Sequence, residues 1–278
     1  MLADFGLLQA VELLSVGALA GVLGGLLGIG GGIVMIPALT LLLGDAYGID
    51  SFHAYKQAAI STSFVLSLTA IQRHRRAQAI VYRMLPGIVP LALVGVIGGV
   101  LLASTLVGEY TPRLKQLFGG FLEVVVLINL YQDWQARRGV MHLCNACPMP
   151  SRRGLIGTVV GLPAGIIAGL LGVGGGIWAV PSQRLLLGVQ IRNAIANSAC
   201  MILFVAALTS LGLSIENARL AHDPPLHWAG WWLTLWLAPG AFAGGWIGAS
   251  LTHTLPTRWL RYAFQGLLAI TGAKLMFP

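Results

Sequence analysis

The sequence predicts an all-α, polytopic membrane protein that contains an internal duplication. Its 278 residues are 56% hydrophobic and only 9% charged, whereas a soluble protein carries about 25% charged residues. A membrane-spanning helix needs roughly 20 apolar residues, so six to eight spans would use about 120 to 160 residues and leave only short loops. The long runs, such as Leu85–Leu106, are apolar on every face rather than alternating as in a transmembrane β-strand. We therefore expect a helical bundle without a separate soluble domain.

The expected helices follow one another with short connections. The hydrophobic segments run over about 7–27, 31–44, 54–72, 85–107, 114–135, 154–173, 176–188, 192–214, 228–252 and 257–277. Glycines alone separate the first two segments, and glycines alone separate 154–173 from 176–188. Because glycine permits backbone conformations that other residues avoid, the sequence predicts a helix broken in its middle at each of these two places.

The two halves of the chain repeat each other. Gly21, Gly25, Gly28, Gly30, Gly31, Gly32, Pro37 and Gly44 recur 144 positions later as Gly165, Gly169, Gly172, Gly174, Gly175, Gly176, Pro181 and Gly188. Further matches follow in order: Ala59–Ser63 with Ala194–Ser198, and Pro90, Gly95 and Gly99 with Pro239, Gly244 and Gly248. We therefore expect a first repeat over residues 1–136, a basic cytoplasmic linker over 137–153 and a second repeat over 154–278.

The net charge of +8 predicts the orientation of the repeats. Lys and Arg collect in cytoplasmic loops, and the loop 73–83 and the linker 137–153 hold four arginines each. The loops 44–53 and 215–227 contain acidic residues and are expected outside. These loop positions fit if each broken segment is a re-entrant hairpin that returns to the side from which it entered, and three crossings follow it. An odd number of crossings in each repeat makes the two repeats inverted relative to each other. Eight plain crossings with parallel halves are the alternative.

The two breaks are the candidate functional site. Inverted repeats with discontinuous helices are typical of transporters whose site lies near the midplane, and a helix N-terminus with small residues favours an anion. The candidate backbone donors are Gly30, Gly31, Gly32, Gly174, Gly175 and Gly176. The alternative is that the glycines serve only close helix packing.

Small polar side chains occur on the next helix of each repeat. The candidates for substrate binding are Gln57, Thr62 and Ser63 in the first half, and Asn197 and Ser198 in the second. Hydroxyls and amides can donate to an oxyanion and still release it. Hydrogen bonding between helices is the alternative role for these five residues.

Glu123 lies near the middle of the segment 114–135. A carboxylate at this depth is costly and marks a candidate functional residue, so Glu123 is the candidate proton carrier. A protonated Glu123 that bonds to a neighbouring helix is the alternative.

The linker contains Cys144 and Cys147 beside His142. These residues could hold a metal with a second protomer, form a redox pair, or stay reduced and inert. A single C-x-x-C pair is weak evidence, and we expect no resident metal or cofactor.

The paired glycine-rich breaks, each followed by Pro37 or Pro181, and the Thr62–Ser63 and Asn197–Ser198 pairs resemble the TauE/SafE family of sulfite exporters. The resemblance covers nearly the whole chain. It implies a secondary transporter of small anions, typically sulfur-containing oxyanions or organosulfonates such as sulfite. The cysteine pair of the linker departs from that pattern.

The sequence contains no nucleotide-binding G-x-x-x-x-G-K-[ST] loop, so an ion gradient or the substrate's own gradient would drive transport. We expect an exporter that works by alternating access in the cell membrane, the inner membrane of a bacterium. An anion channel with the same site is the alternative. A membrane-embedded enzyme is a further alternative, which the sequence disfavours because it shows no paired carboxylates or other catalytic groups. The expected partners are the anion, protons or another coupling ion, and lipid, without nucleic acid.

Overall fold

The computed structural model describes residues 7–44, 51–105, 111–137, 153–220 and 224–254, with single residues between 262 and 273. In these ranges the first half contains α1 (Leu7–Leu27), α2 (Gly32–Leu43), α3 (Ser51–Arg76), α4 (Leu85–Thr105) and α5 (Thr111–Arg137). The second half contains α6 (Arg153–Ile156), a π-helical turn (Gly157–Gly161), α7 (Leu162–Leu171), α8 (Gly176–Leu187), α9 (Ile191–Leu220) and α10 (Pro224–Thr254). The prediction of a helical bundle is confirmed for the described part of the chain.

The predicted helix breaks are present. Helix α1 ends at Leu27 and α2 begins at Gly32, while α7 ends at Leu171 and α8 begins at Gly176. The linker cysteines and most of the segment 257–277 lie outside the described residues, so the division into repeats and linker stays a prediction.

Two predicted loops are shorter than expected. Helix α3 already begins at Ser51, and α9 continues to Leu220. The apolar pattern marks only the part of a helix that faces lipid or the core, and polar residues such as His53 and Glu216 extend the helix beyond it.

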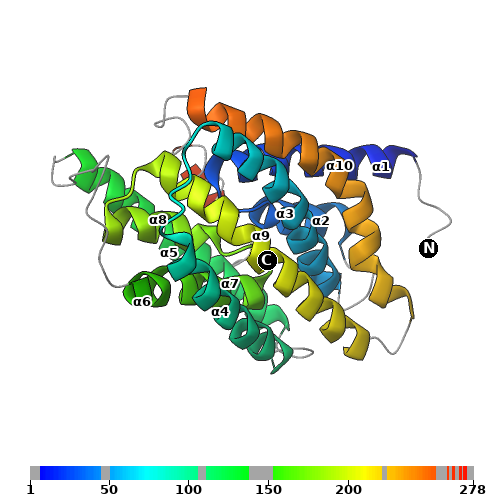
Figure 1. Cartoon of the computed structure of the whole chain (residues 1–278). Coiled ribbons are helices and arrows are strands. Elements are labelled where there is room, and N and C mark those ends of the chain that lie inside the picture. Colours follow the sequence, from blue (N-terminus) through cyan, green and yellow to red (C-terminus); the bar gives the residue numbers. More distant parts are fainter. Residues whose placement is uncertain are drawn as a thin grey trace.

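The two halves pack against each other through equivalent helices. Helix α1 packs along α10, and α7, its counterpart in the second half, packs along α4, the counterpart of α10 (Figure 1). Helix α3 packs against its own counterpart α9. The first helix of each broken pair therefore packs on the other half of the chain, whereas α2 and α8 pack against α3 and α9 of their own halves.

Glycines form both of these helix contacts. A Cβ at Gly25 of α1 would lie 2.6 Å from the carbonyl oxygen of Gly245 on α10, and a Cβ at Gly169 of α7 would lie 2.6 Å from that of Val96 on α4. Real Cβ atoms do not approach oxygen so closely, so the missing side chains let the backbones meet. The glycines before each break thus serve packing.

The outer surface is apolar, as expected for a protein in lipid. Leu19, Leu101 and Leu127 expose 63%, 63% and 65% of their surface. Three helical stretches of the described chain are long and apolar enough to cross a bilayer, namely Leu8–Leu27, Leu85–Thr105 and Ile191–Ala218. The inverted orientation of the two repeats stays a prediction.

Candidate functional site

Both breaks use glycine in the left-handed backbone region. In the first break, Gly28 and Gly30 have φ of +66° and +78°, and in the second, Gly172 and Gly174 have φ of +72° and +78°. Residues with a Cβ rarely adopt these angles. The matching values explain why the glycines at these positions are repeated in the sequence.

The two breaks cross each other. A Cβ at Gly32, the first residue of α2, would lie 2.9 Å from the carbonyl oxygen of Gly172 and 2.9 Å from Cα of Val173. A Cβ at Gly176, the first residue of α8, would lie 2.7 Å from Cα of Ile29. Each of the two helices therefore begins in backbone contact with the other break, and the two breaks form one site.

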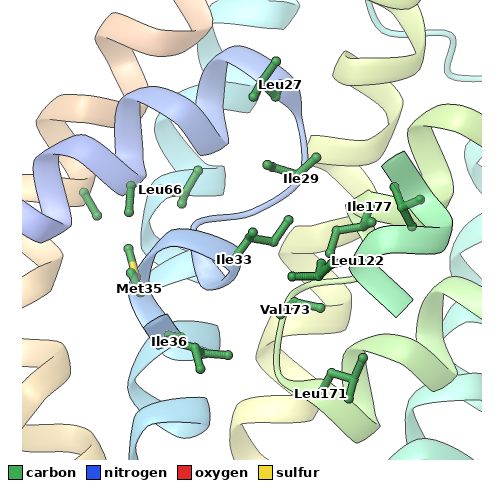
Figure 2. Packing of buried hydrophobic residues seen from close by; sticks show 14 of the residues in the cluster. Leu27, Ile29, Ile33, Met35, Ile36, Leu66, Leu122, Leu171, Val173 and Ile177 are labelled. Carbon is green, nitrogen blue, oxygen red and sulfur yellow. The ribbon is translucent and has the colours of Figure 1, made fainter. Parts of the chain in front are cut away.

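A continuous apolar core surrounds this crossing. Ile29, Ile33, Val173 and Ile177 are buried and pack in one cluster, which Leu122 of α5 completes (Figure 2). Backbone that is not helical persists at membrane depth only where protein or a water-filled cavity covers it. The crossing is covered by protein.

The start of α2 has backbone donors without acceptors. The N–H of Gly31 donates to Oγ of Ser63, at 3.1 Å, and the N–H groups of Val34 and Met35 donate to the carbonyl of Gly31. The N–H groups of Gly32 and Ile33 are buried and have no acceptor among the described residues. A buried donor left without an acceptor costs about 1–3 kcal/mol.

The start of α8 has the same property. The N–H groups of Trp178 and Ala179 donate to the carbonyl of Gly175. Those of Gly176 and Ile177 are buried, and the described part of the chain offers them no acceptor. The partial positive charges of two helix N-termini and four unpaired donors are thus brought together at the crossing.

Two of the predicted side chains reach the breaks. Ser63 accepts the bond from Gly31 and donates to the carbonyl of Ala59 at 2.8 Å. Ser198 donates to the carbonyl of Gly28 at 2.6 Å. Both serines are fully buried and both contact the first break, although they come from different halves.

Thr62 lies beside Ser63 on α3. Its side chain is fully buried, and its hydroxyl has no hydrogen-bond partner in the described part of the protein. Among the five predicted polar residues it is the one whose side chain has no partner in the described structure.

Gln57 connects helices away from the breaks. Its Nε2 donates to Oγ of Ser214 at 2.9 Å, and its Oε1 accepts a bond from Asn217. These bonds join α3 to α9, which is the interhelical alternative considered for this residue.

Asn197 also connects segments. Its Oδ1 accepts a bond from the N–H of Val81 at 2.8 Å, and its Nδ2 donates to Oε1 of Gln183 at 3.0 Å. Asn197 thus ties the segment before α4 and helix α8 to α9.

Glu123 is half-buried on α5. Its carboxylate lies against Gly272, where a Cβ would be 2.6 Å from Oε1. No hydrogen bond joins Glu123 to the glycines or serines of the crossing in the described structure, so the structure does not bring it together with them.

Three buried ionisable residues were not among the candidate site residues that the sequence predicted. His53 and Lys56 of α3 and Glu216 of α9 are buried. A charged Lys56 inside the apolar segment 54–72 was the available signal. The burial of His53 and Glu216 was not predicted, because both residues were assigned to external loops.

A helical bundle in which two broken helices cross within an apolar core belongs to the class of membrane transport proteins. This chain belongs to the sulfite exporter TauE/SafE family, whose sequence profile matches residues 13–275. The resemblance noted in the sequence is therefore confirmed.

Relatives of this chain in sequence are named as membrane transporters. The chain is 25% identical to the probable membrane transporter protein MamO of Paramagnetospirillum magneticum, over 99% of this chain and 46% of MamO. It is 24% identical to the probable membrane transporter protein YunE of Bacillus subtilis, over 96% of this chain and 97% of YunE. A probable membrane transporter protein of Haemophilus influenzae is 27% identical over 94% of this chain and 96% of its own length.

This chain spans about half the length of MamO. No solved structure matches this chain.

Proposed function

We propose that this protein is a secondary transporter that moves small anions across the cell membrane by alternating access around the crossed breaks. The observation that carries the proposal is the set of four buried N–H groups, at Gly32, Ile33, Gly176 and Ile177, that lack acceptors among the described residues. An oxyanion supplies acceptors and favours the positive ends of helix dipoles. Thr62 adds a buried hydroxyl that can donate to the same ligand.

The proposed substrates are sulfur-containing oxyanions or organosulfonates, with sulfite as the first to test. The name of the family supports this choice and supports export as the direction. Binding through backbone dipoles and a hydroxyl is weaker than binding through a fixed guanidinium. A transporter has to release its substrate, and these weaker donors suit that step.

The exchange of equivalent helices between the halves supports alternating access. The first helix of each broken pair packs on the other half, α1 on α10 and α7 on α4. Rocking of two such inverted repeats about a central site is the motion that this architecture permits. The covered crossing favours a transporter over a channel, because a channel needs a continuous open path.

Counterflow in proteoliposomes tests the proposed function. Vesicles that contain the purified protein are loaded with unlabelled sulfite, and the uptake of labelled sulfite is compared with that of sulfate, thiosulfate, sulfoacetate and acetate. We expect counterflow for at least one sulfur oxyanion or sulfonate, above the level of vesicles without protein. Absence of counterflow for every anion would refute the proposal.

Thr62→Val then tests the site. The substitution keeps the shape of the side chain and removes one hydroxyl donor, so we expect the apparent affinity to fall about tenfold. Thr158→Val is the matched control, because Thr158 is exposed and its hydroxyl donates to the carbonyl of Leu155. Equal effects of the two substitutions would remove Thr62 from the site.

A further inference from the structure

Helices α3 and α9 bury three ionisable side chains next to each other. His53, Lys56 and Glu216 expose 1%, 0% and 6% of their surface. Lys56 interacts electrostatically with both His53 and Glu216. Burying a charge is costly unless a partner compensates it, so this cluster needs an explanation.

The charged atoms of the cluster have no hydrogen-bond partners. Nζ of Lys56, both carboxylate oxygens of Glu216 and both ring nitrogens of His53 lack one among the described residues. Nζ of Lys56 lies over the ring of Phe52, 5.8 Å from its centroid. An ammonium has three donors and a carboxylate about four acceptor positions, and a buried pair built for stability would use them.

A hydrogen-bonded frame holds the two charges in place. Gln57, which follows Lys56, bonds to Ser214 and Asn217, which flank Glu216 on α9. The spacing of Lys56 and Glu216 therefore does not depend on a bond between the two charges. A ligand or a proton can change their interaction without separating the helices.

Lys56 is also linked to the crossed breaks. A Cβ at Gly172 would lie 3.0 Å from Cβ of Lys56 and 3.2 Å from its carbonyl oxygen. The backbone of Lys56 thus packs against the end of α7, where the second break begins. A movement of this break would move Lys56 relative to Glu216.

We propose that Lys56 and Glu216 form a second anion site that couples transport to a proton. The ammonium of Lys56 binds the oxyanion on its path to or from the breaks. Glu216 is the counter-ion of Lys56 while no anion is bound, and it takes up a proton when the anion replaces it. This inference rests on the proposed function, and it makes the transport step the movement of an anion together with a proton.

Glu216 is assigned as the proton acceptor after comparison with the other ionisable groups on the neighbouring helices. The titratable residues on helices packed against α3 or α9 are the exposed Glu12 on α1, Arg184 on α8 and, among the described side chains of α10, His253, while α2, α4 and α7 contain none. On α3 and α9 themselves, Arg73–Arg76 and Arg192 lie at the opposite ends of the helices, whereas Arg219 follows Glu216 by three residues on α9. Tyr55 precedes Lys56, and its hydroxyl donates to the carbonyl of Gly44. His53 is the remaining buried ionisable neighbour of the pair.

Two transport modes separate this role from a structural one. The first is exchange of sulfite for sulfite at equal pH, which requires binding but no net proton movement. The second is net uptake of sulfite driven by an inward proton gradient, followed with a pH-sensitive dye inside the vesicles. We expect wild-type protein to perform both and to change the internal pH during the second.

Glu216→Gln should lose the proton-driven uptake together with the internal pH change. Exchange should persist with a changed apparent affinity for sulfite, because the substitution removes the counter-ion that competes with the anion for Lys56. Lys56→Gln should lower the apparent affinity for sulfite in exchange by about tenfold, because it removes a charged donor, and Lys56→Arg should restore part of it. Glu12→Gln is the matched control, since Glu12 is exposed, and it should behave as wild type.

Each other result overturns the inference. It fails if Glu216→Gln keeps proton-driven uptake, if Glu123→Gln abolishes that uptake while Glu216→Gln does not, or if wild-type net uptake of sulfite proceeds without any change of the internal pH. In these cases the proposed function stands, whereas absence of wild-type counterflow for every anion would refute the proposed function itself. If Glu216→Gln does not fold, the double variant Lys56→Gln with Glu216→Gln removes both buried charges, and persistent coupling in it overturns the inference.

Discussion

The two breaks have nearly the same sequence but are held in different ways. At the first break, Gly31 is in the right-handed region, with φ of −78° and ψ of −12°, and Ser63 caps its N–H. At the second, the equivalent Gly175 is in the left-handed region, with φ of +73° and ψ of −6°, and a Cβ there would overlap the carbonyl oxygen of Ala164. The crossing of the backbones is therefore alike in the two halves, while the contacts that hold each side differ.

A π-helical turn adds to the difference. In the second half Pro163 has no N–H, so the carbonyl of Val159 one turn earlier lacks its helical partner. The indole Nε1 of Trp178 on α8 donates to this carbonyl at 3.0 Å. The equivalent positions in the first half are Leu19 and Val34, which can form no such bond.

These contacts indicate that the two hairpins can move in different ways. The second is tied internally, from the π-helical turn to α8, and α8 is also bonded to α9 through Gln183 and Asn197. The first is tied to the neighbouring helices through Ser63 of α3 and Ser198 of α9. We expect the second hairpin to move as one body and the first to respond to α3 and α9.

The largest difference is expected between Gly175→Ala and Gly31→Ala. An alanine at position 175 would adopt a left-handed conformation and press on Ala164, which together cost about 3 kcal/mol or more. An alanine at position 31 keeps an ordinary conformation and meets Cε of Met35 at 2.7 Å, the flexible end of a side chain, at a cost of about 1 kcal/mol.

Thermal unfolding in detergent and counterflow in vesicles measure both substitutions. Gly175→Ala should lower the melting temperature strongly and abolish counterflow, and Gly31→Ala should retain a folded, partly active protein. Equal losses would mean that the backbone angles of the two breaks do not differ in the membrane.

A double-mutant cycle tests the internal tie of the second hairpin. Trp178→Phe leaves the carbonyl of Val159 without its donor and should cost about 2 kcal/mol. Pro163→Ala supplies a backbone N–H for the same carbonyl, so Trp178→Phe should cost less in that background. The free energies of unfolding of the four proteins give the coupling, and additive effects would show that the indole bond does not compensate for the proline.

The sequence predicted the features that depend on local pattern. The helical segments follow from hydropathy, and the breaks follow from glycines at 28, 30, 172 and 174, whose left-handed angles other residues rarely adopt. The different conformations of Gly31 and Gly175 could not be predicted, because the triplets read alike and neighbours from other helices decide the outcome.

The same limit applies to the polar side chains. Thr62, Ser63 and Gln57 lie within two turns of α3, but one has a free hydroxyl, one caps a break and one joins α9. Which helix each residue faces depends on tertiary packing. The buried cluster of Lys56 and Glu216 likewise forms only when α3 packs against α9. These two helices are far apart in the sequence.

The smallest effects are expected from the two serines that hold the first break. Ser63→Ala removes the cap of the Gly31 N–H and should cost about 1 kcal/mol, and Ser198→Ala removes the bond to the carbonyl of Gly28 at a similar cost. Since both bonds tie the first hairpin to its neighbours, each loss should change the rate of counterflow more than the melting temperature. Ser15→Ala is the control, because the hydroxyl of Ser15 is exposed and bonds within its own helix. If both serine variants transport at the wild-type rate, the first hairpin does not depend on α3 and α9, and the contrast between the two breaks is one of structure without a consequence for transport.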